Sequence, residues 1–150
     1  MVTKMKLFRG CNLFQFIDIQ QRQMIEPKSF TFEIIFTHDG SIRCDGSATC
    51  GLSRQNAIVG HQIDSRKFKT SGISTTPHFE IAKKYALHID KYPSGIVLEL
   101  DLENLDLSKY EIITVAEKIK SPNKPEDEER ILKRYDNLAI PLDIFRIHKI

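Results

Sequence analysis

Apolar and polar residues follow two spacings along the chain, and each spacing predicts a different element. In 96–102, aliphatic residues occupy every second position and two acidic residues lie on the alternate face, which predicts a strand. In 78–86, apolar residues recur at intervals of three and four, which predicts an amphipathic helix. The segment 72–77, which leads directly into that helix, is rich in β-branched residues and typical of a strand end. Thr76 is the expected N-cap, and Pro77 suits the first helical turn.

The same spacings predict the remaining elements. Further strands are expected over 5–10, 30–37, 41–44, 110–115 and 128–132, the second and third of these forming a hairpin through His38-Asp39-Gly40. Leu13, Ile17 and Gln20-Gln21, with Phe16, Met24 and Ile25 around them, predict an amphipathic helix that ends before Pro27. A short helix followed by a polar connection is expected in 54–69. Loops are expected over 45–53 and 118–127, and the core candidates near the end are Leu142, Ile144, Ile147 and Ile150. Many strands with two or three helices predict an α+β fold.

Composition and charge narrow the class of protein. The 150 residues suit one domain spanning 1–150, and 41% hydrophobic with 28% charged residues is ordinary for a soluble globular protein. A net charge of +2 is too small to indicate a nucleic-acid or membrane partner, and no apolar run approaches membrane-spanning length. The first ten residues lack the apolar core of a secretory signal. We therefore expect a cytoplasmic protein, or one delivered to a host cytosol by a route that does not read such a signal.

Cysteine and histidine spacing gives no sign of a metal site. The three cysteines, Cys11, Cys44 and Cys50, are odd in number and include no C-x-x-C pair, which favours free thiols in a reducing compartment. A Cys44–Cys50 bridge is the alternative. The five histidines have no metal-binding spacing, so no metal is expected. The chain also carries no nucleophile elbow, phosphate-binding loop or dinucleotide glycine fingerprint.

Three short segments form an ordered set. They are Leu7-Phe8-Arg9-Gly10, Ile73-Ser74-Thr75-Thr76 and Asp127-Glu128-Glu129-Arg130-Ile131-Leu132. In this order they resemble the Arg, Ser-Thr-Ser and Glu motifs of mono-ADP-ribosyltransferases of the cholera-toxin-like class. The helix with Ala82, Tyr85 and Ala86 and the late Ile140-Pro141 are similar to further segments of that family. Each motif alone is common, but their order and their placement at strand ends make the set specific.

The resemblance implies both a fold and an activity. The fold would be a split β-sandwich of two small sheets, with a few flanking helices around an NAD cleft. The enzyme would cleave the nicotinamide–ribose bond of NAD, its substrate, and transfer ADP-ribose to an acceptor, most simply a protein. Transfer to water would give NAD glycohydrolase activity. Small members without a secretion signal resemble intracellular toxins or effectors, and the oligomeric state is left open.

The chemistry of NAD cleavage explains the residue types. Breaking the bond develops positive charge on the ribose, which a carboxylate beneath it stabilises. The resemblance makes Glu129 that carboxylate, Ser74 its support, and Arg9 the group that binds the diphosphate, because a guanidinium fork matches phosphate oxygens. The resemblance also implies that the backbone of Gly10 approaches nicotinamide. Thr75 would support the sheet beneath Ser74 and Glu129. Phe79 or Phe68 would supply an aromatic ring that stacks on nicotinamide.

The acidic run leaves two registers open. Glu129 is followed by one variable residue and an aliphatic pair, as in the family, which favours Glu129 over Glu128. The residue two positions earlier, which meets the acceptor, is then Asp127, where the family usually has Glu or Gln. Aspartate is shorter by one methylene, so its reach toward an acceptor is reduced. The third residue of the central motif, Thr76, also departs from the commoner serine.

Two other functions compete with this interpretation. One is a catalytically silent module that binds NAD or a partner, which the Asp127 departure favours slightly and the intact Arg, Ser and Glu set opposes. The other is a nucleic-acid-modifying member of the superfamily, suggested by Arg66, Lys67 and Lys69 around Phe68. The small net charge does not favour nucleic acid. The loop 117–127 corresponds to the family's acceptor-recognising loop and carries Lys118, Lys120 and Lys124.

Overall fold

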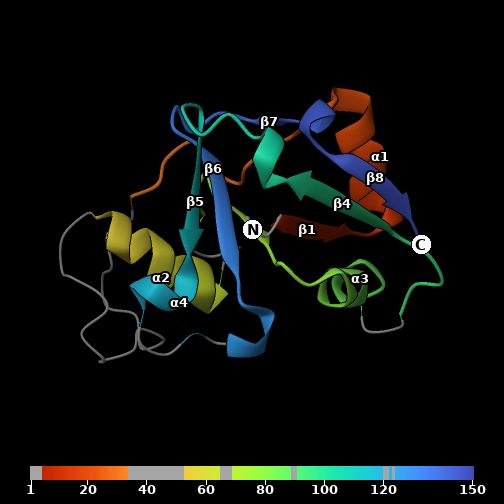
Figure 1. Ribbon diagram of the computed structural model, residues 1–150, viewed down its shortest axis with the longest axis horizontal. Helices are drawn as coiled ribbons and strands as arrows, with labels where there is room; N and C mark the ends of the chain where they lie inside the picture. The colour runs from red at the N-terminus through yellow and green to blue at the C-terminus, as the bar shows by residue number, and fades with distance from the viewer. Residues whose placement is uncertain (1–4, 34–52, 65–68, 89–90, 120–121, 123) are drawn as a thin grey trace.

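Two small antiparallel sheets form the centre of the molecule (Figure 1). The computed structural model describes residues 5–33, 53–64, 69–88, 91–119, 122 and 124–150, and all structural statements concern these residues. One sheet has the order β1-β4-β8, from β1 (Lys6–Cys11), β4 (Ile96–Asp101) and β8 (Arg146–Lys149). The other has the order β3-β6-β5, from β3 (Ile73–Thr75), β6 (Arg130–Arg134) and β5 (Tyr110–Thr114). A short pair, β2 (Met24–Ile25) and β7 (Ile140–Pro141), completes the strands.

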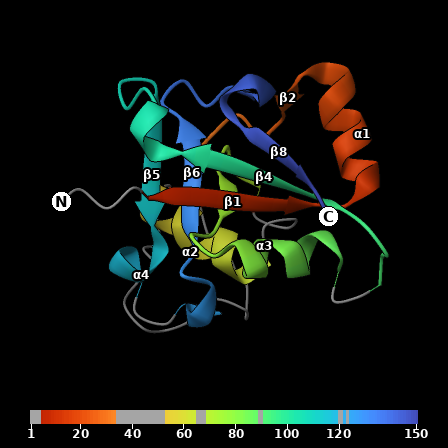
Figure 2. The same cartoon turned by 45° about the vertical axis from the view of Figure 1, so that its right-hand side comes forward.

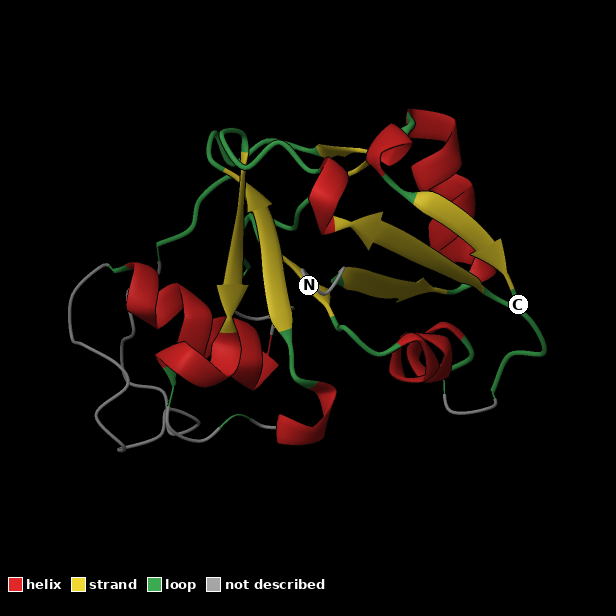
Figure 3. Ribbon diagram, viewed as in Figure 1, coloured by secondary structure: helices red, strands yellow, loops and turns green. Residues whose placement is uncertain are grey.

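In the described part of the chain, four α-helices lie around the sheets (Figure 3). They are α1 (Leu13–Arg22), α2 (Arg54–Asp64), α3 (Phe79–Ala86) and α4 (Val115–Lys118), with 3-10 turns η1 (Leu102–Asn104), η2 (Pro125–Asp127) and η3 (Leu142–Ile144). Helix α3 packs along β1 and β4, whereas α2 and α4 pack together beside the second sheet (Figure 2). No helix in the described ranges is long and apolar enough to cross a membrane.

Apolar side chains form two cores, one on each face of the second sheet. The larger core joins the two sheets and includes Leu7, Leu98 and Leu132, all fully buried. The smaller core lies under α2 and includes Ile131, Ile113 and Ala57. Side chains alternate along a strand, so consecutive residues of β6 enter different cores. Both faces of β6 are therefore buried over its central residues.

A backbone bridge between Phe8 and Thr76 joins the two sheets next to the central motif. Phe8 N donates to Thr76 O at 2.7 Å, and Thr76 N donates to Phe8 O at 2.9 Å. Arg9 follows Phe8, and Ser74 lies two residues before Thr76, so the bridge places the first and second motifs against each other. The third motif joins them because Ser74 pairs with Ile131 and Thr75 with Arg130 in the β3–β6 register.

Gly10 allows α3 to lie directly on β1. A Cβ built on Gly10 would lie 2.0 Å from Ala82 O and 2.7 Å from Ala86 N, closer than any side chain tolerates. Ala82 and Ala86 are themselves buried, with exposed fractions of 1% and 0%. Small residues on both elements thus bring the helix backbone against the strand backbone, which positions the rest of α3 over the central motif.

Most predicted elements are present. Strands occupy most of 5–10, 96–102 and 110–115, and helices lie within 13–27, 54–69 and 78–86, where the sequence placed them. Two small antiparallel sheets with few helices agree with the predicted α+β class. The predicted hairpin falls largely on 34–52, outside the described residues, and 30–33 is not a strand. The predicted Cys44–Cys50 alternative also lies outside them, while Cys11 is a buried free thiol.

Several local predictions are wrong. Helix α1 buries Phe16 and Ile19, whereas Leu13 and Ile17 are 44% and 52% exposed, because α1 meets the sheet through the neighbouring side of the helix. The N-cap of α3 is His78 rather than Thr76, so Pro77 precedes the helix. Strand β6 begins at Arg130, two residues late, because Pro125–Asp127 forms a 3-10 turn.

Two other regions also depart from their predicted burial. In the predicted core of the last segment, Leu142 is buried, but Ile147 is 42% exposed on β8, which is an edge strand. In the loop predicted to be exposed, Ile119 is buried in the smaller core.

Candidate functional site

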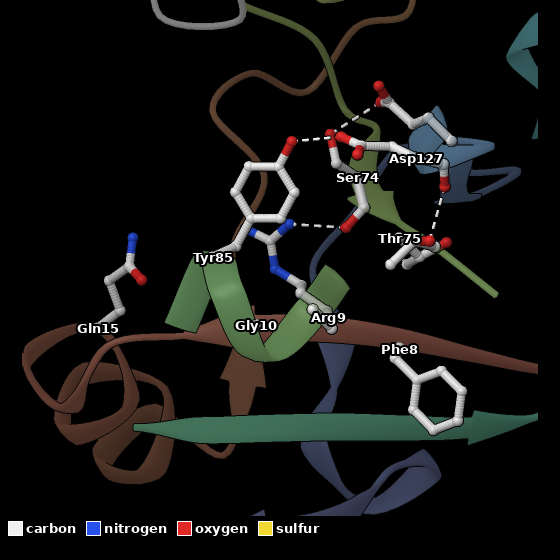
Figure 4. Close-up of a pocket in the computed structure, with 11 residues that line it drawn as sticks. Phe8, Arg9, Gly10, Gln15, Ser74, Thr75, Tyr85 and Asp127 are labelled. Atoms are coloured by element: carbon white, nitrogen blue, oxygen red, sulfur yellow. Dashed lines mark hydrogen bonds between the residues drawn. The ribbon is translucent and has the colours of Figure 1, made fainter. Parts of the chain in front are cut away.

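A cavity of about 300 Å³ opens where β1, β3, α3 and the segment before β6 meet (Figure 4). Its lining residues are Phe8, Arg9, Gly10, Gln15, Ser74, Thr75, Thr76, Ala82, Tyr85, Asp127 and Glu129. All three segments singled out in the sequence therefore contribute to one cavity. Of the predicted site residues, Arg9, Gly10, Ser74, Thr75, Asp127 and Glu129 line it together.

Arg9 connects β1 to the central motif. Its Nη1 donates a 2.9 Å hydrogen bond to the backbone carbonyl of Ser74, as Figure 4 shows. Its Nε is buried and has no hydrogen-bond partner among the described residues. The guanidinium also lies near Cys11, where burial raises the pKa of the thiol and Arg9 partly opposes that rise. Arg9 thus holds the strand end in place and keeps further N–H groups for an anionic ligand.

Ser74 and Glu129 are joined directly. Ser74 Oγ donates to Glu129 Oε2 at 2.9 Å, and the Glu129 side chain is only 18% exposed. The other carboxylate oxygen, Oε1, accepts a hydrogen bond from Gln62 Nε2 on α2. Both oxygens of Glu129 are therefore held by donors, which fixes the orientation of the carboxylate in the cavity wall.

His61 completes this network, although the sequence did not single it out. The side chain is 5% exposed, and its Nε2 lies 2.7 Å from Ser74 Oγ and 3.1 Å from Glu129 Oε2. Ser74 already donates its hydroxyl hydrogen to Glu129, so it can only accept from His61, and Nε2 must carry a hydrogen. On the other side of the ring, Nδ1 lies 3.4 Å from Thr70 Oγ1. His61 therefore supports both the serine and the glutamate from behind.

The two candidate glutamates point to different places. Glu128 is the C-cap of η2, has a left-handed backbone with φ 47°, and pairs with His78 on the surface. Glu129 points toward Ser74 and lines the cavity. Strand alternation alone would have paired Asp127 with Glu129, and both do line the cavity, but a turn rather than a strand places them there.

Asp127 is held from two sides at the cavity mouth. Its carbonyl accepts a 2.6 Å hydrogen bond from Thr76 Oγ1, and its carboxylate accepts one from Tyr85 Oη on α3 (Figure 4). Burial raises the pKa of Tyr85, and the hydrogen bond to Asp127 raises it further. The Lys124 ammonium lies 5.4 Å from the centre of the Tyr85 ring. Tyr85, Asp127 and Lys124 thus form one cluster beside the carboxylate of Glu129.

The remaining predicted residues have other surroundings. Phe79 is not among the described residues that line the cavity, because it packs edge-on against Phe8 and His148 at 5.5 and 5.6 Å. The aromatic rings that do line the cavity belong to Phe8 and Tyr85. Gly10 lines it, but α3 fills the space where its Cβ would lie. Thr75 ties β3 to β6 through a 2.7 Å hydrogen bond from Oγ1 to Arg130 O. Phe68 lies outside the described residues.

Two lining residues could have been found from local signals. Gln15 forms a capping box with Asn12, in which Gln15 N donates to Asn12 Oδ1 at 2.8 Å and Asn12 N donates to Gln15 Oε1 at 3.0 Å. The Asn-x-x-Gln spacing predicts such a helix start. Tyr85 lies on the predicted helix, one turn beyond buried Ala82. His61 and Gln62 had no comparable signal, because their partners are distant in sequence.

The arrangement suits stabilisation of positive charge in a bound substrate. A half-buried carboxylate, held by three donors, lines a cavity that Arg9 also lines. Such a carboxylate stabilises positive charge that develops in a bound substrate. Within the described ranges, no group of three or more His, Cys, Asp or Glu side chains is placed to hold a metal ion.

Comparison with known proteins identifies a family. The family model NarE matches residues 6–132, which is most of the chain. The matched range includes Arg9, Ser74 and Glu129, together with α2 and α3. No curated protein matches the chain.

Proposed function

Because the chain belongs to the NarE family, an ADP-ribosyltransferase-like family, we propose that it cleaves NAD and transfers ADP-ribose to an acceptor. The family match supports the resemblance at the level of ADP-ribosyltransferases. We propose the finer class, the one with Arg, Ser-Thr-Ser and Glu motifs, because Arg9, Ser74 and Glu129 line one cavity. The observation that carries this proposal is the continuous contact from Arg9 through Ser74 to Glu129 inside one cavity.

Glu129 would act on the ribose of NAD. Loss of nicotinamide leaves an oxocarbenium-like ribose, and a fixed carboxylate nearby lowers the energy of that charge. Ser74, His61 and Gln62 hold Glu129 in place before substrate arrives, so little reorganisation is needed during the reaction. The electron pair of the broken bond leaves with nicotinamide, and the acceptor nucleophile then forms the new bond at the ribose carbon.

Arg9 would hold the diphosphate. Only its Nη1 is engaged with Ser74 O, and its buried Nε has no hydrogen-bond partner in the described part of the chain. The diphosphate oxygens would accept from the outer N–H groups of the guanidinium, one of which already donates to Ser74 O. The cavity volume of about 300 Å³ lies at the low end of ligand pockets, which suits the reacting end of NAD.

Asp127 would meet the acceptor. It lines the cavity two residues from Glu129, and the hydroxyl of Tyr85 already occupies part of its carboxylate. A side chain with a polar N–H or O–H could donate to the remaining lone pairs while it approaches the ribose. We propose a protein as the acceptor, with water as the competing acceptor that would give glycohydrolysis.

Nicotinamide release from NAD tests the proposal. The wild type is compared with Glu129→Gln, which keeps the side-chain length and removes the charge. Glu128→Gln is the matched control, because Glu128 faces His78 on the surface. Release by the wild type and by Glu128→Gln, with loss in Glu129→Gln, would support the proposal. Absence of release from the wild type, with NAD binding retained, would favour a silent binding module, and loss only in Glu128→Gln would reverse the register.

A further inference from the structure

A second cavity lies near the other end of β6, on the face that carries α2. Its volume is about 440 Å³, and its lining includes Phe30, Phe32, Arg54, Glu111, Lys133 and Tyr135. Lys133 follows Glu129 by four residues, which in extended chain is about 13 Å. Ile131, fully buried under α2, lies between the two positions. The second cavity is therefore separate from the first and shares no lining residue with it.

Lys133 is the unusual residue of this cavity. Its side chain is only 6% exposed, and its Nζ donates to Arg134 O at 3.0 Å. Glu111 Oε1 is 3.9 Å away, which is an ion pair but too long for a hydrogen bond. An ammonium has three N–H groups, so two of them have no hydrogen-bond partner in the described ranges. Burial lowers the pKa of this amine, with Glu111 opposing the shift and Arg54 adding to it.

The charges that line the cavity are already balanced. Arg54 Nη2 donates to both oxygens of Glu111, at 2.7 and 2.8 Å. Glu111 therefore forms ion pairs with both Arg54 and Lys133. Glu33 adds a second carboxylate to the lining. Two cations face two anions. A ligand with a net charge would upset this balance, which favours a neutral ligand.

Aromatic rings supply flat surfaces around the buried amine. The Lys133 Nζ lies 5.4 Å from the centre of the Phe32 ring and 5.8 Å from that of Tyr135. Phe32 is buried, but Phe30 and Tyr135 are 61% and 56% exposed. Exposed aromatic rings beside a cavity with free donors suit a planar ligand that stacks on a ring and accepts hydrogen bonds.

We propose that this second cavity binds a neutral planar heterocycle of the nucleobase type. The base would stack on Tyr135 or Phe30, and a ring nitrogen or carbonyl would accept from Lys133. Every nucleobase has a π-face and ring or carbonyl acceptors, so both requirements are met by one ligand class. This inference does not depend on the proposed NAD chemistry, because its residues lie outside the first cavity.

Titration of adenosine and cytidine into the full chain, followed by saturation-transfer NMR and calorimetry, tests this site. Ribose is the probe without a base. Lys133→Met keeps the length of the side chain and removes the donors, and Tyr135→Leu removes the ring from an exposed position. Lys91→Met and Tyr92→Leu are matched controls, because Lys91 lies 5.6 Å from the Tyr92 ring in a similar pair remote from the cavity.

The proposal expects both nucleosides to bind, ribose not to bind, and Tyr135→Leu and Lys133→Met each to weaken binding at least fivefold. The controls and Glu129→Gln should bind as the wild type does. Three results would overturn it: no nucleoside binding by the wild type, binding that Tyr135→Leu and Lys133→Met leave unchanged, or binding that Glu129→Gln abolishes. Should Lys133→Met fail to fold, Tyr135→Leu decides alone.

Discussion

Ser74 and Glu129 are 55 positions apart in sequence, yet Ser74 Oγ donates a 2.9 Å hydrogen bond to Glu129 Oε2. The contact follows from the pairing of β3 with β6, in which Ser74 lies opposite Ile131. A strand pairing thus brings the second and third motifs together, and the Phe8–Thr76 bridge adds the first. The register of strand pairing thus determines the geometry of the candidate site.

Ser74→Ala should reduce NAD cleavage without unfolding the protein. The change removes a hydrogen bond to a carboxylate, worth about 1.5–3 kcal/mol, so kcat/KM should fall by about ten- to hundredfold. Steady-state nicotinamide release measures the effect. Ser108→Ala is the matched control, because Ser108 Oγ donates to the exposed Asp106 at 2.6 Å, outside the cavity. Equal activity in the two variants would contradict the role of Ser74.

His61 should act as a positioning residue for the same carboxylate. His61→Ala removes the buried N–H that contacts Ser74 and Glu129, so kcat should fall while KM changes little. His61→Gln retains a donor and should recover part of the loss. Because His61 and Ser74 act on one group, the double variant should lose less than the sum of the two single losses.

Additive losses, or no recovery with glutamine, would argue against a positioning role for His61. His78→Ala is the surface control, since His78 pairs with exposed Glu128. Its activity should match that of the wild type.

The sequence could predict the three motif segments because each has a local pattern. Alternating aliphatic residues indicated β4, and the β-branched run before α3 indicated β3. Arg9 lies on β1 and Ser74 on β3, and these strands belong to different sheets, so their meeting depends on the Phe8–Thr76 bridge, which no local pattern indicates. A resemblance to a known order of motifs then supplied Glu129. Strands and helices of this kind can be predicted from one sequence, because the spacing of apolar residues within each segment indicates them.

The residues that the sequence missed depend on long-range contacts. His61 is buried on α2, and its partners are distant in sequence: Ser74 lies on β3 and Glu129 just before β6. Nothing near His61 in sequence therefore marks it. The prediction for α1 grouped Leu13 and Ile17 with Phe16, because all three are similarly apolar and spacing does not rank them, but of these three only Phe16 is buried. Tertiary packing decided between two apolar sides of one helix, and spacing alone could not.

Gly10→Ala should destabilise the fold more than Gly95→Ala. A Cβ at position 10 would lie 2.0 Å from Ala82 O, which is backbone and cannot rotate away. At position 95 the closest atoms, Ala86 Cβ and O, are 3.0 Å away, so a small shift suffices. We expect Gly10→Ala to lose at least about 1–3 kcal/mol of unfolding free energy, as overpacked cores do. Urea unfolding with an unchanged slope measures the difference, and equal midpoints would contradict the close packing of α3 on β1.

Tyr85 should ionise at a higher pH than an ordinary tyrosine, whose pKa is about 10. Burial raises its pKa most, and the hydrogen bond that it donates to Asp127 raises it further. Since the folded pKa exceeds the unfolded one, the contribution of Tyr85 to stability is complete below about pH 10 and is lost as the pH rises through the folded value. Alkaline titration of tyrosinate absorbance, taken as wild type minus Tyr85→Phe, isolates this group.

Asp127→Asn separates the two causes of the raised Tyr85 pKa. It removes the carboxylate but leaves the burial, so the pKa of Tyr85 should move part of the way back toward its ordinary value. Tyr110 provides an internal reference, because burial raises its pKa and it does not line the cavity. A difference curve that titrates like an ordinary tyrosine, or one that Asp127→Asn leaves unchanged, would break the link between Tyr85 and Asp127. In that case the carboxylate of Asp127 would be free to meet an acceptor through both oxygens.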